Sequence, residues 1–197
     1  MNQELRLELL AMREHDMRVR DEVVKGASAF DGYHPRMEEV HLRNAERLKQ
    51  IIAEHGWPGR SLVGEDGMIA AWFIAQHAIS DPPFQRRALE LIQEAKSRGE
   101  ASAIGAAFLE DRICVFEGRP QVYGTQFEPD EHGMPQPCPI TDPEHVNERR
   151  KALGMNTVEE RTREIQEFDR PEEPGPEKLA AYHRQQDEWL RRVGWRK

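Results

Sequence analysis

The segment IAAWFIAQHAI, residues 69–79, has a composition that is apolar on nearly every side of a helix. Such a helix is stable only when other elements cover it all round, so the segment predicts a buried helix over about 66–79 in the middle of a domain. The helix should end where Asp81 is followed by two prolines, because proline cannot continue a helix.

The flanking sequence predicts the helices that would cover this central one. Hydrophobic residues at helical spacing indicate helices over about 3–25, 36–55 and 83–98. Capping-box patterns beginning at Thr141 and Thr157 predict two more helices, which end near residues 153 and 168.

The periodicity changes near residue 112. β-Branched and aromatic residues predict a small β-hairpin over 112–127, with strands at its two ends. A proline-rich linker at 170–176 then precedes an amphipathic helix at 177–197. We therefore expect a mainly α protein, with five to seven helices packed around the buried helix. Its single helical domain should span 1–169, with the C-terminal helix as an appendage.

Composition narrows the class of protein. The 197 residues carry 28 Lys+Arg and 36 Asp+Glu, a net charge of −8 that argues against a nucleic-acid partner. No run approaches the roughly 18 apolar residues that cross a bilayer, and the charged N-terminus does not resemble a signal peptide. Two cysteines without a metal or redox spacing do not form a disulfide framework. These features predict a cytoplasmic protein without a membrane partner.

The first helix carries a carboxylate where an apolar side chain is expected. Leu9, Met12 and Val19 follow a 4–3 spacing whose missing member is Asp16. A buried carboxylate is costly unless it is paired, and Arg13 or Arg20 on the same helix could be the partner. One interpretation is a structural salt bridge; the other is a functional carboxylate that faces a cavity.

The second helix shows the same irregularity. His41 and Asn44 interrupt an apolar stripe that includes Met37, Leu48 and Ile51. Each could be a satisfied interior residue, but polar gaps on two inner faces favour a shared pocket.

The central helix ends in the strongest single candidate. His77 precedes Asp81 by four residues, a spacing that lets a carboxylate orient an imidazole for general acid–base catalysis. A cationic histidine that stabilises the helix end is the alternative. We predict His77, Asp16 and Asp81 as catalytic residues.

Polar and aromatic residues near these positions are candidates for substrate binding. Exposed strand residues and turn plugs have the same composition, so structural roles remain open for each. The predicted binding residues are Asn44, Trp57, Gln76, Gln85, Tyr123 and Gln126.

The sequence predicts neither a cofactor nor a metal. It contains no P-loop, dinucleotide-binding or nucleophile-elbow motif. His41, His77, Asp81 and Asp16 could ligate zinc, iron or manganese, but no HExxH or ExxH pair supports such a site.

Several short motifs occur together along the chain. They include Met12-(x3)-Asp16-(x3)-Arg20, Asn44-(x3)-Leu48, Gly56-Trp57-Pro58, Gln76-His77-Ala78, Asp111-Arg112, Tyr123-Gly124-Thr125-Gln126 and Arg149-Arg150. In these motifs the chain resembles a bacterial family, common in actinobacteria, that is described as a domain of unknown function. The resemblance covers roughly residues 8–155 and implies a bacterial cytoplasmic protein, with no catalytic residue to transfer. The family usually has an acidic residue where Ile79 follows Gln-His-Ala here.

Two hypotheses follow for function. The first is a hydrolase or lyase that acts on a polar metabolite or natural-product intermediate by acid–base chemistry, with His77 oriented by Asp81 or Asp16. The second is a non-catalytic binding or interaction module, in which the polar residues fix helix packing. In either case the C-terminal helix is a candidate contact for a second copy of the chain.

Overall fold

The computed structural model describes residues 1–25, 30–168 and 174–197. The chain divides into two compact units, one made of Met1–Ser28 and Tyr33–Ala106, the other of Ala29–Gly32 and Ala107–Lys197. The sequence analysis predicted one helical domain over 1–169, with the C-terminal helix as an appendage; here that helix belongs to the second unit. Residues 170–173 of the predicted linker lie outside the described residues.

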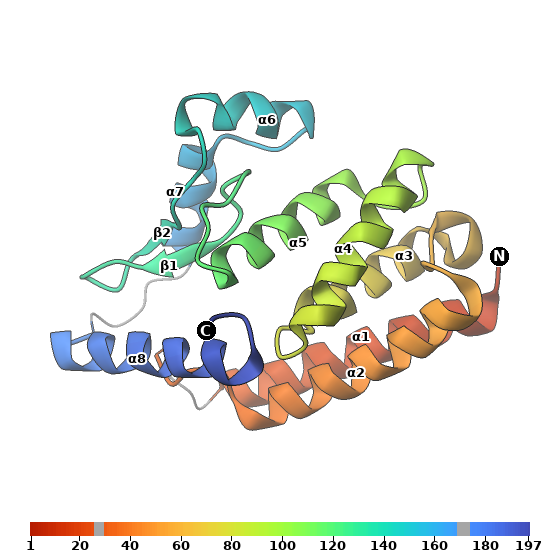
Figure 1. Cartoon of the computed structure of the whole chain (residues 1–197), viewed down its shortest axis with the longest axis horizontal. Coiled ribbons are helices and arrows are strands. Elements are labelled where there is room, and N and C mark those ends of the chain that lie inside the picture. The colour runs from red at the N-terminus through yellow and green to blue at the C-terminus, as the bar shows by residue number, and fades with distance from the viewer. Residues whose placement is uncertain (26–29, 169–173) are drawn as a thin grey trace. The chain divides into compact units, whose positions relative to one another are not determined.

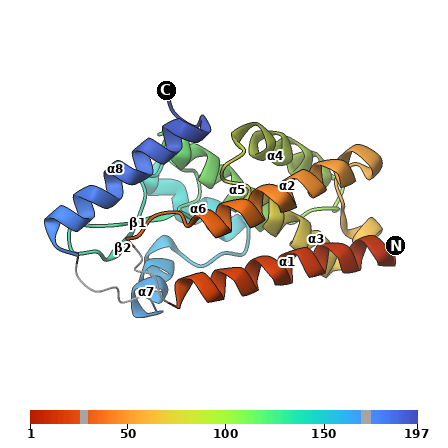
Figure 2. The same cartoon turned by 90° about the horizontal axis from the view of Figure 1, so that it is seen from below.

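The first unit is helical. Its four helices are α1 (Gln3–Val24), α2 (Pro35–His55), α3 (Arg60–His77) and α4 (Pro82–Ser97). α3 contacts α1, α2 and α4, and α1 also packs along α2, to which it runs antiparallel (Figures 1 and 2). Ala70, Ala71, Ile74 and Ala75 of α3 are all buried, as predicted for a helix with an apolar surface all round.

Local signals explain where these helices begin and bend. The side chains of Asn2 and Asp81 cap α1 and α4 by accepting hydrogen bonds from the backbone N–H groups of Leu5 and Phe84. α3 is interrupted at Gly64, whose φ of 75° and ψ of 176° are not helical and favour glycine. The predicted helix at 66–79 therefore corresponds to the part of α3 after this kink.

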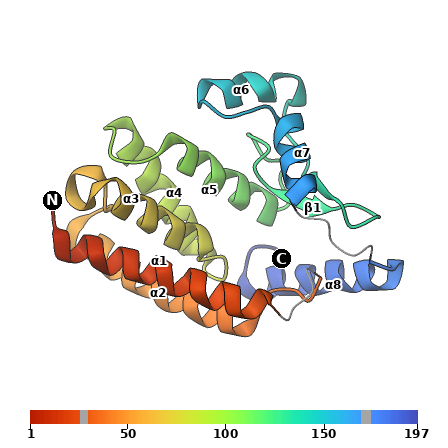
Figure 3. The same cartoon turned by 180° about the vertical axis from the view of Figure 1, so that it is seen from behind.

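The second unit combines helices with a small antiparallel hairpin. α5 (Ala103–Phe116) begins in the first unit and continues into the second. β1 (Phe127–Pro129) pairs with β2 (Pro135–Pro137), with Phe127 opposite Pro137. A 3-10 turn, η1 (Pro143–His145), leads into α6 (Val146–Ala152), followed by α7 (Val158–Phe168), which packs against β2 (Figure 3).

The fold is mainly α, as expected, but the hairpin lies elsewhere in the sequence. The predicted strand at 112–116 is wrong, because these residues form the end of α5. Residues 121–126 form an irregular loop instead of a strand. The described residues contain seven α-helices before the C-terminal one, within the expected five to seven. Over the described range 30–168, the structure does not form the capping box expected at Thr141. The residue before η1 is Asp142, whose side chain makes no capping hydrogen bond among the described residues, and α6 begins only after η1.

The C-terminal helix α8 (Pro176–Val193) packs within the second unit. Leu190 and Trp195 are buried, and the ring of Phe116 lies 5.6 Å from that of Trp189 and 5.4 Å from that of Trp195. Arg196 donates hydrogen bonds to the carbonyl oxygens of Val115 and Phe116. The C-terminal half of α8 thus buries apolar surface against its own chain. No helix in the described ranges combines the length and apolarity needed to cross a membrane.

Candidate functional site

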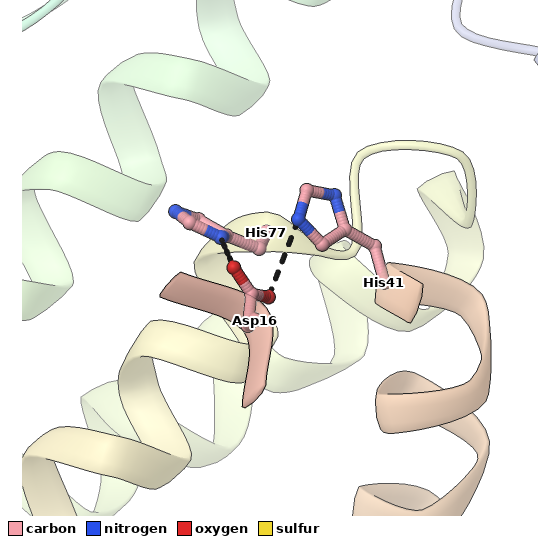
Figure 4. Close-up of side chains that lie close together, drawn as sticks. All are labelled: Asp16, His41 and His77. Atoms are coloured by element: carbon pink, nitrogen blue, oxygen red, sulfur yellow. Dashed lines mark hydrogen bonds and ion pairs between the residues drawn. The ribbon is translucent and has the colours of Figure 1, made fainter. Parts of the chain in front are cut away.

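Asp16 is the centre of a polar cluster in the first unit. It lies on the inner face of α1, is fully buried, and has apolar neighbours on the same face in Leu9 and Val19. Its contacts are not the arginines of its own helix that the sequence suggested. They are His41 of α2 and His77 of α3, so three helices each supply one member (Figure 4).

His77 ends α3 and forms the well-aligned contact. Its Nδ1 lies 3.0 Å from Oδ1 of Asp16, a hydrogen bond in which the ring N–H donates to the carboxylate. The ring lies against Phe73, with centroids 3.9 Å apart, and Arg13 lies over the Phe73 ring. The His77 side chain is 21% exposed, whereas Asp16 is inaccessible. His77 is therefore the member of the cluster that solvent can reach.

His41 approaches the other carboxylate oxygen in a different way. Its Nε2 lies 3.2 Å from Oδ2 of Asp16, but both atoms are buried without a hydrogen-bond partner among the described residues. The distance suits an ion pair, but an N–H bond at Nε2 would not be directed at Oδ2, so the two atoms form no hydrogen bond. The other ring nitrogen, Nδ1, lies 2.5 Å from the hydroxyl of Tyr33. Tyr33 is held against an apolar cluster of Val19, Met37 and Val40.

The two histidines hold Asp16 in its ionised form. Burial acts to raise the pKa of the Asp16 carboxyl, but the close approach of His41 and His77 outweighs burial and lowers the pKa well below its ordinary value. The site therefore contains a buried anion between two imidazole rings whose centroids are 4.8 Å apart. Such an arrangement can hold one positive charge, as a proton or as a metal ion.

A surface groove lies along the same pair of helices. It has a volume of about 510 Å³ and its lining includes Met12 and His15 of α1, and Arg43 and Asn44 of α2. Met12 precedes Asp16 by four residues, and Asn44 follows His41 by three. α1 and α2 run antiparallel (Figure 2), so both offsets point toward the same end of the helix pair. Met12 and Asn44, which line the groove, therefore lie about one helical turn, roughly 5–6 Å along the helix axis, from Asp16 and His41.

Other predicted site residues in the first unit have structural roles. Asp81, the alternative orienter of His77, caps α4 and forms an ion pair with Lys49, whose Nζ is 2.6 Å away. Gln85 is fully buried, and its side-chain nitrogen donates to the carbonyl oxygens of Ala75 and Gln76. It thereby satisfies carbonyls at the end of α3 and positions the turn that carries His77. Gln76 is buried beside it.

Trp57 and Asn44 fit their predicted roles to different degrees. Trp57 is half-buried in the turn between α2 and α3, and it is not among the groove residues. Asn44 is nearly buried, and its side-chain nitrogen lies 3.5 Å from the carbonyl oxygen of Met12. Asn44 is thus the predicted binding residue that the structure brings to the groove.

Tyr123 and Gln126 lie in the second unit, in a loop organised by the buried carboxylate of Asp111. That carboxylate accepts hydrogen bonds from the backbone N–H groups of Val122, Tyr123 and Thr125. Gln126 accepts a hydrogen bond from Arg112 through its side-chain oxygen. The Tyr-Gly-Thr-Gln segment is therefore explained as a loop anchor.

Sequence reasoning underestimated His41 and missed Tyr33. His41 was recognised as a polar gap in an apolar stripe, but it was not included among the predicted site residues. Tyr33 precedes α2 in an irregular segment, where periodicity carries no information. The signal that could have selected His41 was its position on the same inner helix face as Asn44.

The fold and the cluster define a mainly helical protein with a buried carboxylate held between two histidines. The chain belongs to DUF6624, a family of unknown function whose sequence pattern matches residues 3–169. The match includes all three members of the cluster and the Asp111 anchor, and it ends before α8. Neither the curated proteins nor the solved structures gave a match.

Proposed function

We propose that this protein is a small-molecule enzyme of the hydrolase or lyase type, with the Asp16–His41–His77 cluster as its reactive centre. The observation that carries the proposal is the placement of a buried, ionised carboxylate against His77, which remains 21% exposed. If Asp16 had a purely structural role, its histidine partner would not need to be accessible to solvent, as His77 is.

Both reactions begin with the removal of a proton, from water in hydrolysis or from the substrate in elimination. When Asp16 accepts the Nδ1 proton of His77, it fixes the tautomer and makes Nε2 of the same ring the basic atom. Phe73, packed on the ring, restricts its orientation. The cluster can therefore receive a proton at a defined atom and stabilise the resulting charge.

The groove offers a few polar groups to a substrate, within a lining that is mostly apolar. Its lining includes the amide of Asn44 and the guanidinium of Arg43, and Nη2 of Arg43 also contacts Nε2 of His15. A small polar or anionic molecule in the groove would extend toward the cluster, about one helical turn away. This substrate class includes the natural-product intermediates that the sequence suggested.

The proposal includes the cellular location of the protein, the bacterial cytoplasm. The sequence resemblance supports a bacterial cytoplasmic protein. Cys114 and Cys138 are both free and buried, which agrees with a reducing compartment.

A substrate screen followed by substitution tests the enzymatic proposal. Purified protein is incubated with panels of esters, amides, phosphoesters and polar bacterial metabolites, and mass spectrometry detects gain or loss of water. For any turnover found, His77→Gln should reduce kcat/KM by about 100-fold or more, because it removes the base. His55→Gln is the matched control, since His55 is an exposed histidine at the end of α2. Full activity in His77→Gln would contradict the proposal.

The burial of Asp16 and His41 favours a second candidate function, a non-catalytic binding module in which the cluster fixes the packing of α1, α2 and α3. In that case His77→Gln would lower the unfolding midpoint, while ligand binding in the groove would depend on Arg43 and Asn44 instead of His77.

A further inference from the structure

The cluster presents the atoms of a transition-metal site. One nitrogen of His41, one nitrogen of His77 and one oxygen of Asp16 all lie within 4.8 Å of one another. Ligand atoms about 2.1 Å from a metal ion lie roughly 3–4 Å from each other. Each imidazole nitrogen lies at that spacing from one oxygen of the same carboxylate. Nδ1 of His77 is 3.0 Å from Oδ1, and Nε2 of His41 is 3.2 Å from Oδ2.

The contact between His41 and Asp16 is incomplete as a hydrogen bond. Nε2 and Oδ2 are 3.2 Å apart and buried, yet neither has a hydrogen-bond partner in the described part of the chain. Buried polar atoms are normally satisfied, so a pair that faces each other without a shared proton needs another explanation. A cation bound between them satisfies both atoms at once.

Tyr33 provides the outer contact that a metal-binding histidine usually has. If Nδ1–H of His41 donates to the Tyr33 hydroxyl, 2.5 Å away, Nε2 is left unprotonated, with a lone pair free for a cation beside Asp16. Packing of Tyr33 against Val19, Met37 and Val40 keeps its hydroxyl in place. The ring of His41 is therefore held in the orientation and tautomer that ligation requires.

We propose that Asp16, His41 and His77 bind one divalent first-row transition metal ion, through a carboxylate oxygen, Nε2 of His41 and Nδ1 of His77. Two imidazoles and one carboxylate suit Zn²⁺, Co²⁺, Fe²⁺ or Mn²⁺, whereas Mg²⁺ and Ca²⁺ prefer oxygen ligands. Binding releases the Nδ1 proton of His77 to solvent, so in the metal-bound protein the ion takes the place of the Asp16–His77 hydrogen bond. The partial exposure of His77 leaves access for a water molecule as a further ligand, as in catalytic zinc sites with three protein ligands.

The absence of a sequence motif is a consequence of the geometry. The sequence predicted no metal because it has no HExxH or ExxH pair to support a site of His41, His77, Asp81 and Asp16. Each ligand comes from a different helix, so the site depends on how α1, α2 and α3 pack. The inference rests on the proposed function only for the location of the reactive centre.

Metal titration of the full-length protein tests the site without a substrate. The protein is treated with a chelator, dialysed and titrated with Zn²⁺ by calorimetry, and with Co²⁺ while visible absorption is recorded. We expect one ion per chain and no binding of Mg²⁺. His77→Gln and His41→Gln should weaken Zn²⁺ binding by more than 100-fold, and Tyr33→Phe by about 10-fold, as for loss of an outer partner.

Two controls make the result specific. His55→Gln removes an exposed histidine of α2 and should leave the affinity and the cobalt spectrum unchanged. Circular dichroism confirms folding of each variant, and His77→Gln, at a partly exposed position, keeps the test usable if His41→Gln does not fold.

Wild-type protein that is folded but binds no Zn²⁺ would overturn the inference, as would equal affinity in wild type and His77→Gln. Because no substrate is used, the lack of any enzymatic activity would leave a positive binding result intact. Conversely, a negative binding result would leave the enzymatic proposal standing.

Discussion

Asp16 and Asp111 are both fully buried aspartates, but their surroundings differ. Asp111 accepts hydrogen bonds from three backbone N–H groups and from the hydroxyl of Thr125, at 2.7–3.0 Å for its shortest contact with each group. Asp16 accepts one aligned bond from His77 and faces His41 without another. A satisfied carboxylate organises structure, whereas an incompletely satisfied one between imidazoles retains capacity for a cation. This difference separates the anchor from the candidate site.

Asp111→Asn should destabilise the protein by about 3 kcal/mol, because the new amide group turns one acceptor into a donor that faces backbone N–H groups. Urea unfolding measures the loss. Asp130→Asn is the control, since Asp130 accepts from His132 and Met134 in an accessible loop and should cost less than about 1 kcal/mol. Equal stability of the two variants would show that Asp111 does not anchor the loop.

Among the elements, α7 begins with the capping box that the sequence predicted. The backbone N–H of Glu160 donates to the Thr157 hydroxyl, and the backbone N–H of Thr157 donates to the Glu160 carboxylate. Thr157→Ala should therefore lower the free energy of unfolding by about 1 kcal/mol. Thr162→Ala, inside the same helix, removes a hydroxyl that bonds only the Val158 carbonyl oxygen, and should be nearly neutral. Thermal unfolding of both variants gives the comparison; a greater loss for Thr162→Ala would contradict it.

Elements bounded by glycine or proline were predictable from the sequence. The expected helices at 3–25, 36–55 and 83–98 differ from α1, α2 and α4 by one residue at most at each end. Their ends depend on local rules, such as proline at the start of a helix. These rules need no knowledge of the tertiary structure.

α5 was not predictable on the same grounds. The run from Arg112 to Phe116 is β-branched and aromatic, and a short apolar run of this kind suits a strand as well as a buried helix. The following loop alternates like a strand, but its N–H groups bond to Asp111 of α5 instead of to another strand. The Asp111 side chain takes the place of a partner strand, and hydrophobic periodicity in the sequence cannot reveal such a contact.

The candidate site was predictable only in part. Asp16 and His77 stood out because each is polar in an apolar setting, and the structure brings them together. The sequence offered Asp16 as one of two possible orienters of His77, beside Asp81. It could not choose between them, because spacing rules describe neighbours within one helix; for Asp16 itself those rules suggested Arg13 and Arg20. The observed contacts depend on the packing of three helices.

For the molecule as a whole, the two units carry different kinds of buried polar chemistry. The first contains the cluster, while in the second the buried side chains of Arg150 and Gln121 bond to the backbone. Arg150 of α6 donates to the carbonyl oxygens of Tyr123, Gly124 and Asn156, and Gln121 bonds the backbone of Gln126 and Cys138. We expect substitutions in the second unit to change stability more directly than ligand or metal binding.

Cys114 and Cys138 can report on the opening of the second unit, because both are buried there. Burial raises the pKa of the Cys138 thiol to about 12, and it also raises the pKa of Cys114. At pH 8 a thiol with a pKa of about 12 is ionised in about one molecule in ten thousand. Only the thiolate reacts with a disulfide reagent, so labelling of Cys138 in the native protein should be at least about 1,000-fold slower than in guanidinium, and labelling of Cys114 should also be slower.

Leu190→Ala should accelerate this labelling. Leu190 is a buried residue of α8, and its truncation should cost about 2–5 kcal/mol in the unit that holds both thiols. When the open form recloses faster than it reacts, the labelling rate follows the population of that form, so the rate should rise by more than 10-fold. Leu7→Ala is the control, because Leu7 lies in the first unit with 55% of its surface exposed. If both variants are labelled at the wild-type rate, α8 does not contribute to the stability of the second unit, and its burial there has no energetic role.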